Sequence, residues 1–186
     1  NDLIYNSILK NENQIKDLKE GKIVILETKD LDPLYKDLFK ACIIVKGSMK
    51  ETFSVISDFS LYNKFMPRIE KIIPDKDKHT YTYYVNLPMN IIYKYKIAAN
   101  MSFSENYSWL SWNLINWEEN DIIDTKGKWI INSIDEKTQL IVYENYTDIG
   151  KIPFGLNWIV KRITQTSLPN ILLNTKKRIE TQPTKK

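Results

Sequence analysis

The feature that most constrains this chain is a long alternation of apolar and polar side chains between residues 91 and 103. The polar positions are Lys94, Lys96, Asn100 and Ser102. A period of two sends successive side chains to opposite faces of a strand. One apolar face and one wet face are typical of an antiparallel sheet. The apolar positions of the run are Ile91, Tyr93, Tyr95, Ile97, Ala99, Met101 and Phe103.

Further strands are predicted wherever β-branched and aromatic residues gather, because these side chains favour extended backbone. Aromatic residues make up 12% of the chain, which suits a β-rich domain. Breaks at Pro74, at Leu87-Pro88 and around Glu136 separate the runs. The predicted strands are 22–28, 38–46, 69–73, 80–87, 91–103, 108–116, 126–134 and 138–148.

Helices are predicted at both ends and after the second strand. Apolar spacing predicts one helix over residues 2–20, stopped by Gly21. Ser48 with Glu51 three residues later is a capping-box pattern, which predicts a helix up to about Asp58 and a second short one over 60–65. The last helix is expected over 156–180, with a kink or restart at Pro169.

Length and charge indicate an ordinary single globular domain. The chain has 186 residues, and 27 Lys and Arg against 23 Asp and Glu leave a net charge of +4. A nucleic-acid binder would show a denser basic stripe, so no nucleic-acid partner is expected. We divide the chain into an N-terminal helix and lead-in strand (1–37), a main domain (38–180) and a polar tail (181–186).

Catalytic and metal sites lack support in the sequence. The one histidine, His79, falls in a charged turn, and the one cysteine, Cys42, lies in an apolar run that predicts a buried thiol. A histidine triad or a zinc site needs several partners for such groups. The acidic cluster at 118–124 is interpreted as a solvated loop. We therefore expect no catalytic residue, no metal and no cofactor.

One stretch, residues 41–67 (ACIIVKGSMKETFSVISDFSLYNKFMP), resembles the opening of the START-like, or SRPBCC, helix-grip superfamily and its polyketide cyclase and coenzyme Q-binding family. The resemblance continues in Leu87-Pro88 before Tyr93, in Gly127-Lys128-Trp129, and in two Pro-containing pairs, at 152–153 and 168–169. It covers about residues 38–180. The matching positions of the opening are Val55, Ile56, Asp58, Phe59, Tyr62, Phe65 and Pro67.

This resemblance implies an α+β helix-grip fold. A curved antiparallel sheet would wrap around a long C-terminal helix, with two short helices after an early strand and an extra N-terminal helix outside the pattern. The family implies a cavity between sheet and helix that binds a hydrophobic small molecule such as a lipid, sterol or quinone. The expected ligand-binding residues are Tyr83, Tyr93, Tyr95, Trp112, Trp129, Phe154 and Trp158. Segments 87–90 and 153–158 would form the gate.

Two other functions stay open. One is a polyketide cyclase-like enzyme, which would need polar groups such as Tyr83, Tyr143 or Arg162 in the cavity. The other is a protein-interaction module, as in ribosome-associated toxin relatives of the family. The inward-facing residues of the strand 138–148 also stay open, because both of its faces carry apolar groups.

Only one short segment of the sequence bears on the cellular compartment of the protein. Residues 18–27 resemble the lead-in of exported members, so an exported or periplasmic protein with a removed signal peptide is one expectation, and a cytoplasmic protein is the alternative. The lysines and arginine at 176–178, 185 and 186 are interpreted as a solvated helix end, with transient contact to an anionic membrane surface as the alternative.

Overall fold

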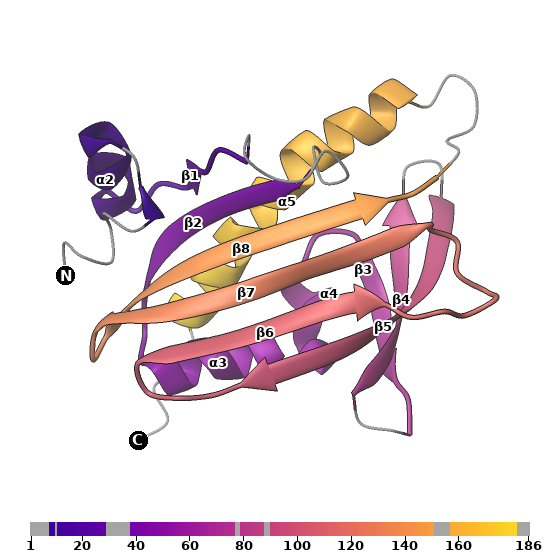
Figure 1. Cartoon of the computed structure of the whole chain (residues 1–186), viewed down its shortest axis with the longest axis horizontal. Coiled ribbons are helices and arrows are strands. Elements are labelled where there is room, and N and C mark those ends of the chain that lie inside the picture. The colour runs from indigo at the N-terminus through magenta and orange to yellow at the C-terminus, as the bar shows by residue number, and fades with distance from the viewer. Residues whose placement is uncertain are drawn as a thin grey trace.

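The computed structural model describes residues 8–9, 11–28, 38–76, 79–87, 90–150 and 157–181, with side chains from residue 167 onward in the last helix. One antiparallel sheet of eight strands, in the order β1-β2-β8-β7-β6-β5-β4-β3, forms the body of the fold (Figure 1). The strands are β1 (Val24–Ile25), β2 (Phe39–Lys46), β3 (Ile69–Pro74), β4 (Thr80–Leu87), β5 (Ile91–Ser102), β6 (Tyr107–Leu114), β7 (Asp124–Asp135) and β8 (Thr138–Asp148).

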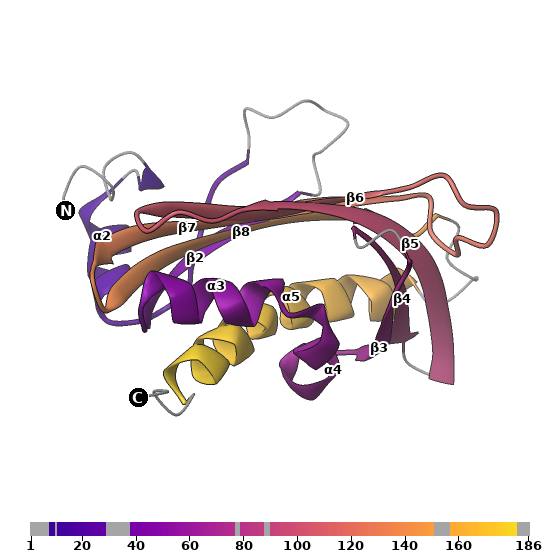
Figure 2. The same ribbon diagram turned by 90° about the horizontal axis from the view of Figure 1, so that it is seen from below.

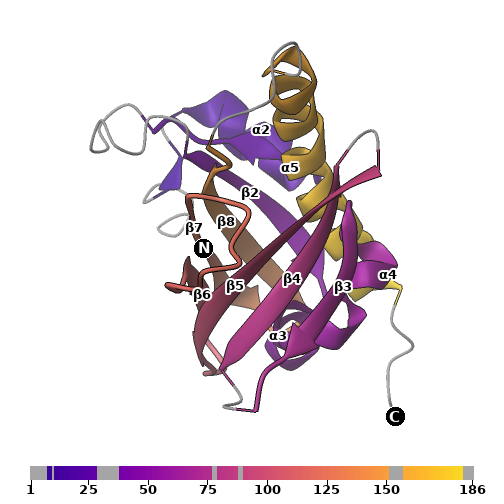
Figure 3. The same ribbon diagram turned by 90° about the vertical axis from the view of Figure 1, so that its right-hand side faces the viewer.

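The helices are assembled on the two sides of this sheet. Figure 2 shows α3, α4 and α5 on the same side, and Figure 3 shows the sheet curving around them. This arrangement is α+β, with a curved antiparallel sheet over a long C-terminal helix, as the family resemblance implies. The helices are α2 (Glu12–Lys19), α3 (Met49–Ser57), the 3-10 turn η2 (Phe59–Leu61), α4 (Tyr62–Phe65) and α5 (Asn157–Glu180).

The start of α3 confirms the predicted capping box. The Ser48 backbone N–H donates to Glu51 Oε2 at 2.8 Å, and the Glu51 backbone N–H donates to Ser48 Oγ at 3.2 Å. Two N–H groups that lack helical partners are satisfied in this way. The hydrogen bonds to Ser48 hold the pKa of the Glu51 carboxyl below its usual value.

Two predicted element boundaries are wrong. The helix over 2–20 is not continuous, because Asn11 is extended and its side chain caps a helix that begins at Glu12. The strand expected over 22–28 shortens to β1, which pairs only with Ala41 and Cys42 of β2. Helix α5, in contrast, has its predicted bounds to within one residue, and of the two outcomes expected at Pro169 the restart does not occur. The packing of the residues after Pro169 on the sheet outweighs the lost hydrogen bond.

Helix α2 builds a second apolar cluster, away from the main core. Leu18 is fully buried against Val24 and Leu26, and the cluster includes Cys42 and Val142 of the sheet. These sheet residues alternate with those that face α3 and α5, so α2 covers part of the outer face. The N-terminal segment thus packs on the back of the main domain.

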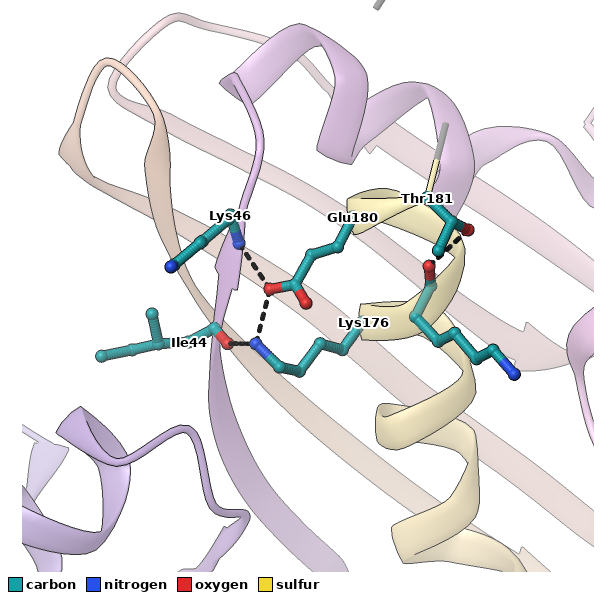
Figure 4. Close-up of polar contacts among 6 residues, drawn as sticks. Ile44, Lys46, Lys176, Glu180 and Thr181 are labelled. Carbon is teal, nitrogen blue, oxygen red and sulfur yellow. Dashed lines mark hydrogen bonds and ion pairs between the residues drawn. The ribbon is translucent and has the colours of Figure 1, made fainter. Parts of the chain in front are cut away.

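Helix α5 is fastened to the edge of β2 that the short β1 leaves uncovered (Figure 4). Lys176 Nζ donates to the Ile44 carbonyl at 2.8 Å, and Glu180 Oε1 accepts from the Lys46 backbone N–H at 2.9 Å. Lys176 and Glu180 also form an ion pair. Side chains of the helix therefore occupy backbone groups that another strand would otherwise pair with. Among the described helices, none has the length and apolar character needed to cross a membrane.

Candidate functional site

The inner face of the sheet is covered unevenly along its strands. At one end, under α3 and the second half of α5, its side chains have almost no exposed surface. Val45, Ile43 and Ile141 are completely buried there, as are Ile131 and Leu110. This end is a packed core, as expected of a protein interior.

The other end of the same face is aromatic and keeps accessible surface. Tyr95, Trp112 and Phe39 are only half-buried although they face inward, because they share a face with the fully buried residues of their strands. The register supports this: Trp112 lies opposite Ala99 and Gly127, and Tyr95 lies opposite Tyr83. Side chains at this end are therefore not sealed by the described part of the chain.

Aromatic rings connect the two ends. The rings of Tyr83 and Tyr95 stack with their centroids 5.5 Å apart, and the ring centroid of Phe59, in η2, lies 6.3 Å from that of Tyr83. On the neighbouring strands, the ring centroid of Tyr143 lies 4.3 Å from that of Trp129 and 6.0 Å from that of Trp112. Such rings bring large apolar surfaces into one place while their hydroxyls stay available for hydrogen bonds.

Gly127 makes room for one of these rings. A Cβ at this position would collide with Cζ2 of Trp112 and with the carbonyl oxygen of Glu144. The Trp112 indole therefore lies directly on the backbone of β7, two residues before Trp129. The Gly127-Lys128-Trp129 segment therefore contributes to the site at two positions: the Trp112 indole packs on Gly127, and Trp129 adds its own indole.

The phenols of this region are strongly desolvated. Burial raises the pKa of Tyr83 well above its ordinary value, and the neighbouring Tyr62, Tyr95 and Tyr143 raise it further. Burial likewise raises the pKa values of Tyr95 and Tyr143. These mutual effects place phenols from α4, β4, β5 and β8 near one another. All of them are neutral, protonated groups at physiological pH.

The structure brings four of the seven expected ligand-binding residues together. Tyr83, Tyr95, Trp112 and Trp129 lie on the inner face, and Trp129 is the most deeply buried, at 2% exposure. Tyr93 is half-buried on the same face, opposite Val85. Phe154 lies outside the described residues, as do Pro88, Met89 and the 153–156 part of the expected gate. Trp158 lies in the first turns of α5, where only the backbone is described.

Sequence reasoning missed the part that Phe59 and Tyr62 have in this site, and it named Tyr143 only for the cyclase-like alternative. Tyr143 lay in the strand whose inward face could not be chosen, and the structure resolves this through its pairing with Trp129 and Ala41. Phe59 and Tyr62 carried the family resemblance but were not assigned to the cavity. Their positions beside Asp58 in the family pattern were the signal that could have assigned them to the site. The Tyr62 hydroxyl donates to the Ile56 carbonyl, which ties α4 to α3.

No metal-binding group of three or more His, Cys, Asp or Glu side chains occurs within the described residues. His79 is exposed, as the turn predicts. Cys42 is fully buried, and burial raises the pKa of its thiol to about 12. Such a thiol is an inert small hydrophobe rather than a nucleophile.

The acidic loop between β6 and β7 has a structural role. Asp121 Oδ2 accepts from the Lys94 backbone N–H at 2.6 Å, and Asn120 Oδ1 accepts from the Lys96 backbone N–H at 2.9 Å. Glu119 forms an ion pair with the Lys94 side chain. The loop therefore continues the pairing of β5 beyond the end of β6.

Comparison with solved structures gives this architecture its class. A START superfamily protein from Mycobacterium smegmatis matches with a TM-score of 0.60 at 15% identity, over 77% of this chain and 97% of the other. The Zhui aromatase/cyclase from Streptomyces sp. R1128 matches with a TM-score of 0.58 at 12% identity, over 77% and 93%. The chain thus has a START-like, helix-grip fold.

A third solved structure extends the match. The STAR-related lipid transfer protein fragment from Xanthomonas axonopodis has a TM-score of 0.59 at 12% identity and covers 92% of this chain and 97% of its own. This coverage is too large to omit the whole segment before β2. No protein-family model matches the sequence, and no curated protein matches it either.

Proposed function

We propose that this protein binds or transfers a hydrophobic small molecule, such as a lipid, sterol or quinone, between the inner face of the sheet and α5. The observation that carries the proposal is the uneven cover of that face. Ile43 and Ile141 are sealed at one end, whereas the aromatic side chains of Tyr95 and Trp112 keep accessible surface at the other. Ligand sites of this class are mostly apolar, with a few polar groups that orient the ligand.

The binding free energy would come mainly from the burial of apolar surface. Removing apolar area from water contributes roughly 25 cal/mol per Å², before the costs of association are subtracted. Tyr93, Tyr95 and Trp112 offer such surface on adjacent strands. Phe154 and Trp158 remain proposed contacts from the other wall. The names of two solved structures of the same fold, a lipid transfer protein and an aromatase/cyclase, support a ligand of this kind.

Native mass spectrometry of the purified protein, followed by organic extraction, tests the proposal. We expect a co-purified apolar molecule at a stoichiometric ratio, or uptake of one from a panel of phospholipids, sterols and quinones. A fluorescent apolar reporter, N-phenyl-1-naphthylamine, gives a second readout because its emission rises in an apolar site. A protein that carries no ligand and takes up neither the panel nor the reporter would contradict the proposal.

The cyclase-like alternative gains support from the position of Tyr83 and Tyr143, which both face inward. Burial raises the pKa values of both phenols, however, and a raised pKa makes a phenol a weaker acid. A general acid works best with a pKa near the operating pH. Binding is therefore the function that these residues support better.

The proposed membrane contact has fewer free charges than the sequence suggests. Lys176 is occupied by the Ile44 carbonyl and by Glu180. Lys177 is exposed on the same turn and remains available. We retain transient contact with an anionic surface as part of a transfer function. Vesicle sedimentation with and without anionic lipid is the measurement that tests it.

A further inference from the structure

Three tyrosine side chains face the site from three strands. Tyr83 comes from β4, Tyr95 from the paired position on β5, and Tyr143 from β8. The side chains of Tyr83 and Tyr143 are 7% and 4% exposed, so each is more than nine-tenths buried. Their rings are held by other rings: Tyr83 by Tyr95, and Tyr143 by Trp129.

These hydroxyls make no hydrogen bond to any residue that the structure describes, in contrast to Tyr62, whose hydroxyl donates to the Ile56 carbonyl. Completely enclosed side-chain atoms without a partner are confined, in the described part of the chain, to Thr52, Gln139 and Arg178. The three unpaired tyrosine hydroxyls are not enclosed in this way. Each one must therefore border space that a solvent molecule or a ligand can reach.

The chemistry of this group is that of hydrogen-bond donors. Among the described residues, the buried polar side chains are threonine, serine and glutamine, without a charged group. Burial raises the pKa values of all three tyrosines, so the phenols keep their protons. A protonated phenol donates one hydrogen bond, and a deeply buried donor without a partner is costly.

We propose that Tyr83, Tyr95 and Tyr143 bind an uncharged oxygen acceptor, such as a carbonyl, on an otherwise apolar ligand. This inference rests on the proposed function, because it assigns the polar end of the same site. Water satisfies the hydroxyls in the free protein. A ligand oxygen replaces that water, whereas a pure hydrocarbon displaces it without compensation. The three hydroxyls thereby select oxygenated ligands over hydrocarbons of the same shape.

A matched pair of planar probes tests the inference. Fluorenone and fluorene have the same three fused rings, and fluorenone carries a carbonyl where fluorene has a methylene. Their affinities are measured by displacement of N-phenyl-1-naphthylamine from the full chain. We expect fluorenone to bind more tightly than fluorene, by about threefold to tenfold for each hydrogen bond formed.

Tyr83→Phe and Tyr143→Phe remove a hydroxyl and keep the ring, so the stacking is preserved. Each substitution should weaken the binding of fluorenone by about threefold to tenfold and leave fluorene unchanged. Tyr107→Phe, on β6 at 45% exposure, is the matched control and should affect neither probe. Thermal unfolding of each variant verifies that the fold is intact.

The outcomes separate the two proposals. If the reporter binds but fluorenone has no advantage over fluorene, or keeps its advantage in both Phe variants, the inference about the hydroxyls is overturned and the proposed function stands. If neither the reporter nor any apolar probe binds, the proposed function fails together with the inference.

Discussion

At the scale of single residues, Gly127 controls where the Trp112 ring lies. A methyl group at this position would meet both that ring and the Glu144 carbonyl. We expect Gly127→Ala to destabilise the fold by about 1–3 kcal/mol, the usual cost of overpacking. Urea unfolding followed by tryptophan emission measures the loss, and a shifted emission of the folded variant would report the displaced indole.

A double-mutant cycle isolates the contribution of the ring. In a Trp112→Val background the indole is absent, so Gly127→Ala should cost less there than in the original chain. The clash with the Glu144 carbonyl remains in both backgrounds. An equal cost with and without Trp112 would show that the ring is not the obstacle.

Residue types alone could predict part of the candidate site. Alternation placed Tyr83 and Tyr95 on the apolar sides of their two strands, and the structure shows that their rings stack. Tyr143 could not be placed, because apolar side chains occupy both faces of β8. One face meets the core and the other meets the cluster under α2. Periodicity disappears wherever a strand is buried on both sides.

At the scale of elements, the start of α3 depends on Ser48. Ser48→Ala removes the acceptor for the Glu51 backbone N–H, and loss of such a cap costs about 1 kcal/mol. Chemical denaturation gives the value. Ser48→Thr keeps a hydroxyl in place and serves as the control. Equal stability of the Ala and Thr variants would speak against the cap.

Two neighbouring lysines, Lys176 and Lys177, allow the contact between α5 and β2 to be tested with a matched control. Lys176→Ala removes the donor to the Ile44 carbonyl and one partner of Glu180. We expect it to cost about 1 kcal/mol and to speed the exchange of nearby β2 amide protons. Lys177→Ala changes the neighbouring exposed residue and should leave both unchanged. Similar exchange in the two variants would contradict the role of Lys176.

Most helices and strands could be located from the local sequence pattern. Where such a prediction fails, the failure has a physical cause. The cap at Ser48 and the bounds of β8 depend on neighbouring residues only, and the structure confirms both. Pro169 is different, because local rules predict a kink or a restart, and the restart does not occur: Leu172 and Ile179 are buried in the core, and α5 continues through the proline. The two-residue length of β1 also depends on partners distant in sequence.

At the scale of the whole molecule, the buried tyrosines predict sensitivity to alkali. Burial raises the pKa values of Tyr62, Tyr83, Tyr95 and Tyr143 in the folded chain. The unfolded chain releases these protons near the ordinary value of 10.0 and therefore binds fewer protons than the folded chain above that pH. The contribution of these tyrosines to the free energy of unfolding is thus fully present below this pH, and the free energy of unfolding falls as the pH rises above it.

Urea titrations between about pH 7 and pH 11 measure this loss of stability. Tyrosinate absorbance in the folded protein should show a group of tyrosines that ionises only together with unfolding. The same chain in concentrated urea, where every phenol is exposed, is the reference. Ionisation of all eleven tyrosines while the fold persists would contradict the burial described for this cluster.

The position of α5 has a consequence for the order in which the molecule is made. A ribosome delivers β2 early, yet its main partner β8 lies nearly a hundred residues later, and α5 follows β8. Long-range pairing of this kind is slow. The aromatic inner face of the nascent sheet therefore stays without its covering helix until the last element emerges. During that interval the growing chain exposes apolar surface, which favours association with other chains.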